Sequence, residues 1–282
     1  MNLIEVQGLC KNFETFHLDN VGMTLEEGFI MGFIGKNGAG KSTTLKTMLN
    51  LMKNDGGSIK LCGLSMPEDE IEIKNQVGYV FGGVDFYPEN KIRVITDITK
   101  LFYKDWDDKR YNELCQRFEI DQNKKFKQLS AGMKVKYSLA VAMSHNARLL
   151  ILDEPTSGLD PAARDDLICM LQEFIEDGKR SVLFSTHITS DLEKCADYIT
   201  YIKGGKILAS QDRESFKKSY ILVNGKKEQL NDELNSKIIG LHKHQLGFEG
   251  MMKIEDSDMA KNAGLECNEP SLDDIMVHIE RH

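Results

Sequence analysis

The chain has 282 residues, of which 41% are hydrophobic and 28% charged, as in an ordinary globular protein with one large domain or one domain and a small extension. Its formal net charge of -8 argues against nucleic acid as a partner, because phosphate recognition usually needs a basic surface. No apolar run approaches the roughly 18 residues of a membrane span, and the scattered cysteines include no CxxC pair that would indicate zinc.

The first part of the chain predicts strands around a glycine-rich loop. Near-alternating apolar residues at 18–25 indicate a half-buried strand, which follows a short apolar strand at residues 3–6. Residues 29–34 are continuously apolar, as expected of a strand buried on both faces of a parallel sheet. A glycine-rich loop is expected next at residues 35–40, followed by a helix at 41–52. A turn at residues 55–57 then leads into a strand at 58–61.

The middle of the chain predicts helices, and strand signals return after it. Residues 88–143 have amphipathic spacing without strand signals, so a helical block is expected there. Strands are predicted next at residues 149–152 and 181–185, each followed by a helix, at 161–176 and 188–195. A hairpin at residues 198–208 ends this part of the chain. Strands that alternate with helices, interrupted by one helical block, indicate an α/β domain with an inserted helical subdomain, over residues 1–215.

Residues 216–282 are polar and carry weak signals, so a small C-terminal extension is expected whose role the sequence does not indicate. Within it, residues 271–279 predict a terminal helix with Ser271 as its N-cap.

A phosphate site is indicated by residues 35–42, whose sequence GKNGAGKS matches GxxxxGKS/T. The glycines let backbone N–H groups turn toward phosphate oxygens, and the N-terminus of the next helix adds positive potential. Lys41 can reach the β- and γ-phosphates, and the Ser42 hydroxyl can bind Mg²⁺. The sequence therefore predicts an ATP–Mg²⁺ site whose binding residues include Gly35, Asn37, Gly38, Ala39, Gly40, Lys41, Ser42 and Thr43.

Two acidic residues end the apolar strand at residues 149–152. The end of a central strand beside a phosphate loop is where nucleotide chemistry takes place in such sheets. We expect Asp153 to bind Mg²⁺ through a water molecule, and Glu154 to orient and polarise the attacking water.

With these motifs the chain resembles the nucleotide-binding domain of an ABC ATPase over residues 1–215. Further segments follow in the family's order: residues 129–133 resemble the LSGGQ signature, residues 157–160 resemble the D-loop, and His187 resembles the switch histidine. The resemblance implies a P-loop NTPase (RecA-like) core with an N-terminal antiparallel β subdomain and the inserted helical subdomain. It also implies ATP hydrolysis, with Glu154, His187 and Lys41 as catalytic residues.

The same resemblance implies partners and a location. Ser130 and Gly132 would bind the γ-phosphate held by the opposite subunit of a head-to-tail homodimer or heterodimer. Phe13 lies where the family has an aromatic residue that stacks on adenine. Transmembrane permease subunits would be other chains, with this subunit at the cytoplasmic face of the membrane. The signature and Lys134 are similar to those of bacterial exporters of the antibiotic- or peptide-resistance kind.

The sequence departs from the family at several positions. Where the family usually has a glutamine that contacts Mg²⁺ and water, alignment by eye finds Gly82, and Asp85 is a possible stand-in. The signature has Ala131 and Met133 in place of glycine and glutamine, and the D-loop has Gly158 in place of alanine. The catalytic residues named above all remain.

Two other functions stay open from the sequence. One is a soluble ABC ATPase that acts on a ribosome or a DNA complex, which the single phosphate loop and the missing coiled-coil insertion disfavour. The other is a binding module without catalysis, which Glu154 disfavours. Residues 86–88 are either an exposed aromatic patch for a partner or a packed loop.

Overall fold

The computed structural model describes residues 1–82 and 87–281, and its chain forms two compact units. The first unit comprises Met1–His187 and Cys195–Ser210, and the second comprises Ile188–Lys194 and Gln211–His282. The division after Ser210 lies five residues before the predicted domain boundary at residue 215.

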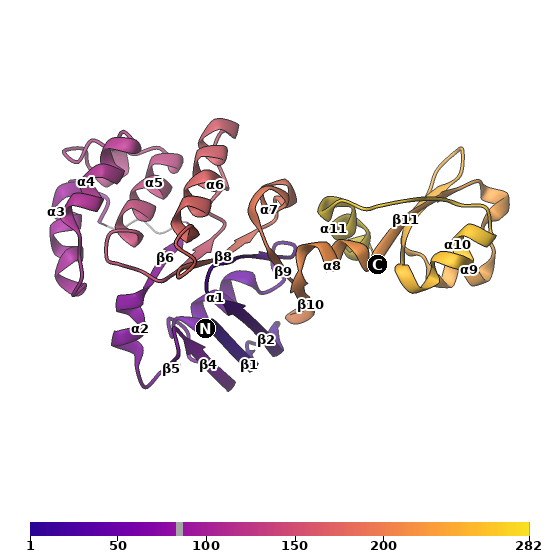
Figure 1. Cartoon of the computed structure of the whole chain (residues 1–282), viewed down its shortest axis with the longest axis horizontal. Coiled ribbons are helices and arrows are strands. Elements are labelled where there is room, and N and C mark those ends of the chain that lie inside the picture. The colour runs from indigo at the N-terminus through magenta and orange to yellow at the C-terminus, as the bar shows by residue number, and fades with distance from the viewer. Residues whose placement is uncertain (83–86, 282) are drawn as a thin grey trace. The chain divides into compact units, whose positions relative to one another are not determined.

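The first unit contains two sheets (Figure 1). An antiparallel sheet has the strand order β2-β1-β4-β5. A second sheet has the order β10-β9-β3-β8-β7-β6, in which β9-β3-β8-β7-β6 are parallel. The strands are β1 (Asn2–Asn12), β2 (His17–Glu26), β3 (Ile30–Ile34), β4 (Gly56–Leu61), β5 (Leu64–Met66), β6 (Val77–Phe81), β7 (Leu149–Asp153), β8 (Ser181–Thr186), β9 (Tyr198–Lys203) and β10 (Lys206–Asp212).

Burial explains this arrangement. Every residue of β3, β7 and β8 is buried, because helices and the antiparallel sheet cover both faces of the parallel strands. Unlike these strands, β2 has buried residues separated by exposed or half-buried ones, as its sequence predicted. The fold class predicted from the sequence is therefore confirmed: an α/β core, an antiparallel β subdomain and a helical insertion.

The helices of the first unit include the predicted insertion. Figure 1 shows α3, α4 and α5 grouped together beside α6. The helices are α1 (Lys41–Met48), α2 (Glu70–Gln76), α3 (Ile92–Thr99), α4 (Asp108–Arg117), α5 (Ala131–Ala142) and α6 (Pro161–Ile175), with a 3-10 turn at Lys100–Phe102.

Two local predictions were wrong. Helix α1 ends at Met48 rather than at residue 52, and Asn50 has a left-handed backbone with φ of 54°. Two residues of the predicted turn at 55–57, Gly56 and Gly57, are instead the start of β4, which pairs with β1. Asp55 accepts a hydrogen bond from the backbone N–H of Asn12 (2.7 Å), so this residue joins two distant segments and does not connect a hairpin.

The second unit is a small α/β domain of its own. Its antiparallel sheet has the order β12-β13-β11-β14 around a separate apolar core. The predicted terminal helix is present, with the backbone N–H of Asp274 donating to Ser271 Oγ at 3.1 Å. The elements are α7 (Thr189–Cys195), α8 (Arg213–Lys218), β11 (Tyr220–Gly225), α9 (Asp232–Lys237), β12 (Ile239–Lys243), β13 (Phe248–Lys253), α10 (Ser257–Asn262), β14 (Glu266–Asn268) and α11 (Leu272–Arg281).

Hydrogen bonds explain why residues 188–194 group with the second unit. The Glu193 side chain accepts from the backbone N–H of Leu272 at 2.9 Å, and its carbonyl accepts from Arg213 at 2.7 Å. Thr189 Oγ1 donates to Asp273 at 3.2 Å. These bonds join α7 to the segments around α8 and α11, although β9 and β10 separate α7 from α8 in the sequence.

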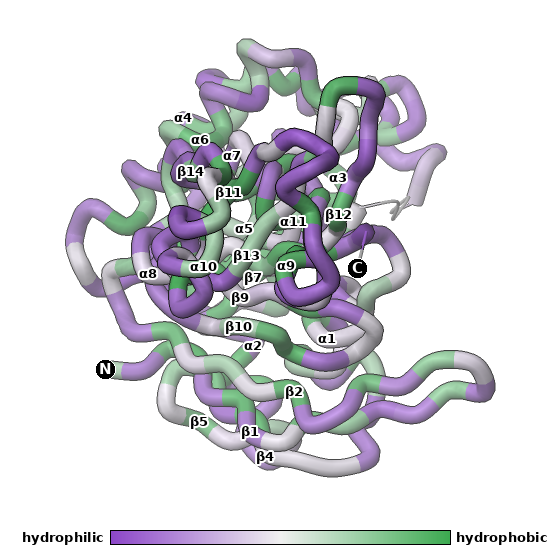
Figure 2. Tube along the Cα trace, turned by 90° about the vertical axis from the view of Figure 1, so that its right-hand side faces the viewer, coloured by the Kyte–Doolittle hydropathy of each residue, from purple (hydrophilic) through white to green (hydrophobic). Residues whose placement is uncertain are grey.

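Hydrophobic and hydrophilic residues follow one another in short stretches along the chain (Figure 2). In the described part of the chain, no helix has both the length and the apolar character needed to cross a bilayer.

Candidate functional site

The glycine-rich loop connects β3 to α1 and is held tightly at both ends. A Cβ added at Gly35 would lie 2.3 Å from the carbonyl oxygen of Ile202, so only glycine fits. Gly40 is the N-cap of α1 with φ of 114°, a backbone conformation that residues with a side chain rarely adopt. The loop borders a cavity of about 390 Å³ lined by Phe16, Lys36, Asn37, Gly38, Gly40, Lys41, Ser42, Thr43 and Glu154.

Lys41 is 5% exposed at the first position of α1. Its Nζ donates to the carbonyl oxygens of Gly35 (2.6 Å) and Lys36 (3.3 Å), so the loop curls around the amino group. The same nitrogen lies 3.2 Å from Glu154 Oε1. The positive charge is therefore held in the wall of the cavity, where it can attract an anion.

The two carboxylates are where the sequence predicted them, at the end of β7. Asp153 is 8% exposed, and its Oδ1 accepts from Ser185 Oγ at 2.6 Å. Glu154 follows with φ of 52°, a left-handed conformation that costs a non-glycine residue on the order of 1 kcal/mol. This turn directs the Glu154 side chain to Lys41 on one side and to His187 on the other, where its Oε2 lies 2.8 Å from Nδ1.

The three predicted catalytic residues thus meet in one place, although 113 and 33 positions separate Lys41 from Glu154 and Glu154 from His187 in the sequence. Glu154 Oε1 is buried and accepts no well-directed hydrogen bond from the described residues, despite its closeness to Lys41. This oxygen can accept a hydrogen bond from a water molecule at the cavity.

The oxygen groups near the cavity suit Mg²⁺. Ser42 lines the cavity, and Asp153 ends the strand beside it. A hydroxyl and a carboxylate are hard oxygen donors, which Mg²⁺ prefers together with phosphate oxygens and waters. The donor set therefore fits the Mg²⁺ ion that the sequence predicted.

Several predicted binding residues lie outside the cavity wall. Ser130 and Gly132 are at the N-terminus of α5, where Ser130 Oγ accepts from the backbone N–H of Met133 at 3.2 Å. Ala39 is buried within the loop. Asp160, in the segment that resembles the D-loop, caps α6 by accepting from Ala163 at 3.0 Å, and this bond lowers the pKa of its carboxyl.

The aromatic residue at the cavity is not the one that the sequence indicated. Phe13 is 43% exposed, with the Lys11 ammonium over its ring. Phe16 lines the cavity, because a bond from Phe13 N–H to the Phe16 carbonyl (2.8 Å) turns the chain there. The two rings are 6.4 Å apart, so the adenine-stacking role of Phe13 stays a prediction that Phe16 now shares.

Gly82 directly follows β6, whose last residue Phe81 pairs with Asp153 on β7. A Cβ added at Gly82 would lie 3.8 Å from the backbone carbonyl oxygen of Asp153, so this position lies beside the end of β7. The possible stand-in Asp85, and Phe86 of the aromatic patch, lie outside the described residues.

Comparison with known proteins gives one consistent result. A family model described as "ABC transporter" matches residues 18–157. The transporter ATP-binding protein EcsA of Bacillus subtilis is 34% identical over 77% of this chain and 91% of its own length. The Nod factor export ATP-binding protein I of Cupriavidus pinatubonensis is 32% identical over 73% of this chain and 65% of its own. A solved ATP-binding subunit of an ABC transporter superposes with a TM-score of 0.70 at 26% identity, covering 76% of this chain and 92% of that one.

Proposed function

Because the chain belongs to the family of ATP-binding subunits of ABC transporters, and is an ATPase, we propose that it powers transport through permease chains that are separate polypeptides. The observation that carries the site assignment is the meeting of Lys41, Glu154 and His187 at the phosphate loop. These groups supply a cation for phosphate, a carboxylate for water and a partner that holds the carboxylate.

The roles of these residues follow from their contacts. The Lys41 amino group and the loop N–H groups bind phosphate oxygens, and this binding replaces the contact of Lys41 with Glu154. Glu154, freed from Lys41 and held by His187, accepts a hydrogen bond from the attacking water. Ser42 and Asp153 would hold Mg²⁺, which would neutralise part of the phosphate charge.

The proposal includes a dimer. Ser130 is the N-cap of α5 and Gly132 lies in its first turn, where backbone N–H groups and the positive end of the helix suit a phosphate. Neither residue lines the cavity beside Lys41. This separation supports their action on ATP that is held by the opposite subunit.

An apolar surface on the helical insertion supports a permease partner. Val94, Ile98, Leu101 and Phe102 form an exposed apolar strip along α3 and the 3-10 turn after it. Leu101 and Phe102 are 79% and 76% exposed, an unfavourable arrangement for large apolar side chains in water. We infer that an amphipathic segment of a permease covers the strip.

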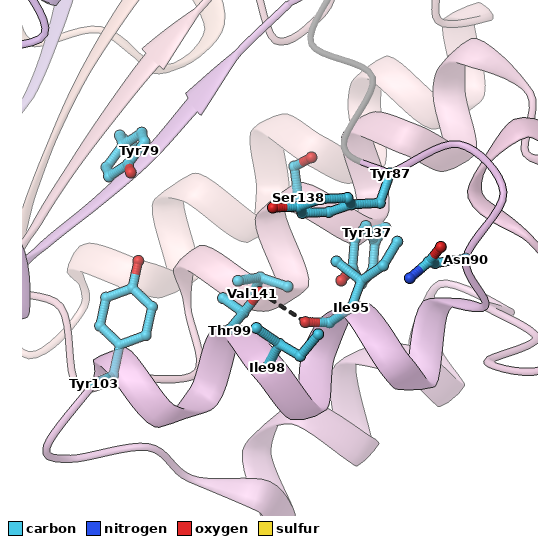
Figure 3. Close-up of a pocket in the computed structure, with 10 residues that line it drawn as sticks. All are labelled: Tyr79, Tyr87, Asn90, Ile95, Ile98, Thr99, Tyr103, Tyr137, Ser138 and Val141. Carbon is cyan, nitrogen blue, oxygen red and sulfur yellow. Dashed lines mark hydrogen bonds between the residues drawn. The ribbon is translucent and has the colours of Figure 1, made fainter.

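A cavity of about 280 Å³ opens beside the strip, and Ile98 belongs to both. Figure 3 shows Tyr79 and Tyr103 toward one end of it and Tyr87 and Asn90 toward the other. Burial raises the pKa of Tyr103 and of Tyr137 to about 12, so both hydroxyls stay neutral at physiological pH. A neutral cavity lined by aromatic rings suits a large apolar side chain of the covering segment.

The double variant Leu101→Ser/Phe102→Ser tests this surface. We expect the yield of co-purified membrane protein to fall on the order of 10-fold, since each buried apolar anchor contributes at least about 1 kcal/mol to binding. ATP hydrolysis by the isolated subunit should change less than about 2-fold, because neither residue touches the site. Affinity capture from detergent-solubilised membranes measures the yield.

Leu208→Ser is the matched control, because Leu208 is another exposed leucine. It lies on β10, at the edge of the six-stranded sheet opposite to β6, the strand that precedes α3. Equal yields from the control and the double variant would contradict a permease surface on α3.

We further propose export, with the subunit at the cytoplasmic face of the membrane. Two observations support export: one relative is a Nod factor export ATP-binding protein, and the signature segment is similar to that of bacterial exporters.

A further inference from the structure

Ser185 lies near the end of β8, directly opposite Asp153 in the parallel pair of β7 and β8. Its side chain is fully buried, with 0% exposure. Ser185 Oγ donates to Asp153 Oδ1 at 2.6 Å, and the backbone N–H of Glu154 donates to the same Oγ at 3.1 Å. One hydroxyl therefore contacts both acidic residues of the site.

The direction of these bonds is fixed by chemistry. A hydroxyl has one hydrogen to donate, and its lone pairs accept. Because the Glu154 N–H is the donor in one bond, the Ser185 hydrogen must go to the Asp153 carboxylate in the other. The Ser185 carbonyl accepts from the same N–H at 3.1 Å, so the turn at Glu154 is held by two oxygens of one residue.

This arrangement restricts both carboxylates. The bond to Oδ1 limits rotation of the Asp153 carboxylate, in a buried setting where a charge-assisted bond is strong. The bond to the Glu154 N–H supports the left-handed conformation that directs the Glu154 side chain to Lys41 and His187. Groups that orient a metal-binding carboxylate typically change metal affinity or activity by about 10-fold to 100-fold when they are removed.

We propose that Ser185 is a positioning residue of the ATPase, which holds the Asp153 carboxylate for Mg²⁺ and the Glu154 backbone for hydrolysis. The proposal rests on the ATP–Mg²⁺ site of the proposed function. Ser181, a buried serine of the same strand, has a different contact, because its hydroxyl donates to the carbonyl oxygen of Glu26.

Ser185→Ala removes the hydroxyl and tests the role. We expect Mn²⁺, titrated as a spectroscopic probe with a non-hydrolysable ATP analogue, to bind about 10-fold or more weakly. The Mg²⁺ concentration for half-maximal hydrolysis should rise in parallel. Affinity for ATP in excess chelator should stay within about 2-fold, because the phosphate loop is unchanged.

Ser181→Ala is the matched control. Ser181 lies on the same strand and is also fully buried, but its hydroxyl donates to the carbonyl oxygen of Glu26 at 2.9 Å, away from the carboxylates. The control should lose stability and keep its Mn²⁺ affinity. Equal Mn²⁺ affinity in Ser185→Ala and Ser181→Ala would overturn the proposal.

A second pair of variants decides the matter if the alanine variant does not fold. Ser185→Thr keeps a hydroxyl. Ser185→Val introduces a side chain with nearly the shape of threonine but without the hydroxyl. The proposal expects the threonine variant to bind Mn²⁺ about 10-fold or more tightly than the valine variant, and equal affinities would contradict it.

Asp153→Asn distinguishes an error in the role of Ser185 from an error in the metal site itself. If Asp153→Asn weakens Mn²⁺ binding and Ser185→Ala does not, only the inference about Ser185 is wrong. If neither variant changes Mn²⁺ binding, the metal assignment within the proposed function is also wrong.

Discussion

Glu154→Gln is expected to lower kcat for ATP hydrolysis by a factor of about 10² to 10⁴, the usual range for losing a group that acts on the proton of a nucleophile. Glutamine keeps the shape of the side chain but loses the charge that faces Lys41 at 3.2 Å and polarises water. ATP affinity should remain within a few-fold, since the phosphate loop is untouched. Steady-state hydrolysis and equilibrium nucleotide binding measure the two effects separately.

Glu119→Gln is a suitable control, because Glu119 also has a left-handed backbone, with φ of 56°, and lies outside the cavity wall. Its kcat should match that of the unmodified protein.

Because Glu154→Gln retains bound ATP, it should also accumulate a dimer with ATP–Mg²⁺, which light scattering detects. Adding Ser130→Ala should remove that dimer, and a persistent dimer would contradict the role of Ser130 in the opposite site.

Lys41→Ala is expected to lower kcat/KM for ATP by about 100-fold or more, equivalent to about 2.7 kcal/mol. The change removes a buried cation that two loop carbonyls hold in place, and it leaves Glu154 without the nearest positive charge. Unlike Glu154→Gln, it should weaken nucleotide binding itself. Direct titration with a fluorescent ATP analogue measures this loss.

Lys46→Ala controls for removal of a lysine from the same helix, because Lys46 lies over the Phe81 ring and is not part of the cavity wall. It should bind ATP normally. Unchanged ATP affinity in Lys41→Ala would show that the phosphate loop is not the nucleotide site.

The sequence predicted the parts of the site that depend on local pattern. The phosphate loop is contiguous, and the apolar strand that ends in Asp153 and Glu154 is a short motif with a clear physical reason. Their closeness to His187 followed from strand order in a parallel sheet, where the carboxyl ends of neighbouring strands meet at one edge.

The remaining features depend on contacts that no local pattern contains. Ser185 is one serine in a buried strand, and its contact with Asp153 arises from the register of β7 against β8. Phe16 reaches the cavity through a turn that neither glycine nor proline marks. The sheet of the second unit was missed because strands such as β14 span only three residues and are partly exposed.

Whether this ATPase works on a membrane permease is tested by capture of tagged Glu154→Gln protein from detergent-solubilised host membranes with ATP–Mg²⁺. We expect a polytopic membrane protein in stoichiometric amount, identified by mass spectrometry and reduced in yield by Leu101→Ser/Phe102→Ser. A second ATPase chain beside it would identify a heterodimer. A trapped dimer that brings ribosomal or DNA-bound partners, or no partner, would contradict the transporter assignment and favour a soluble ATPase.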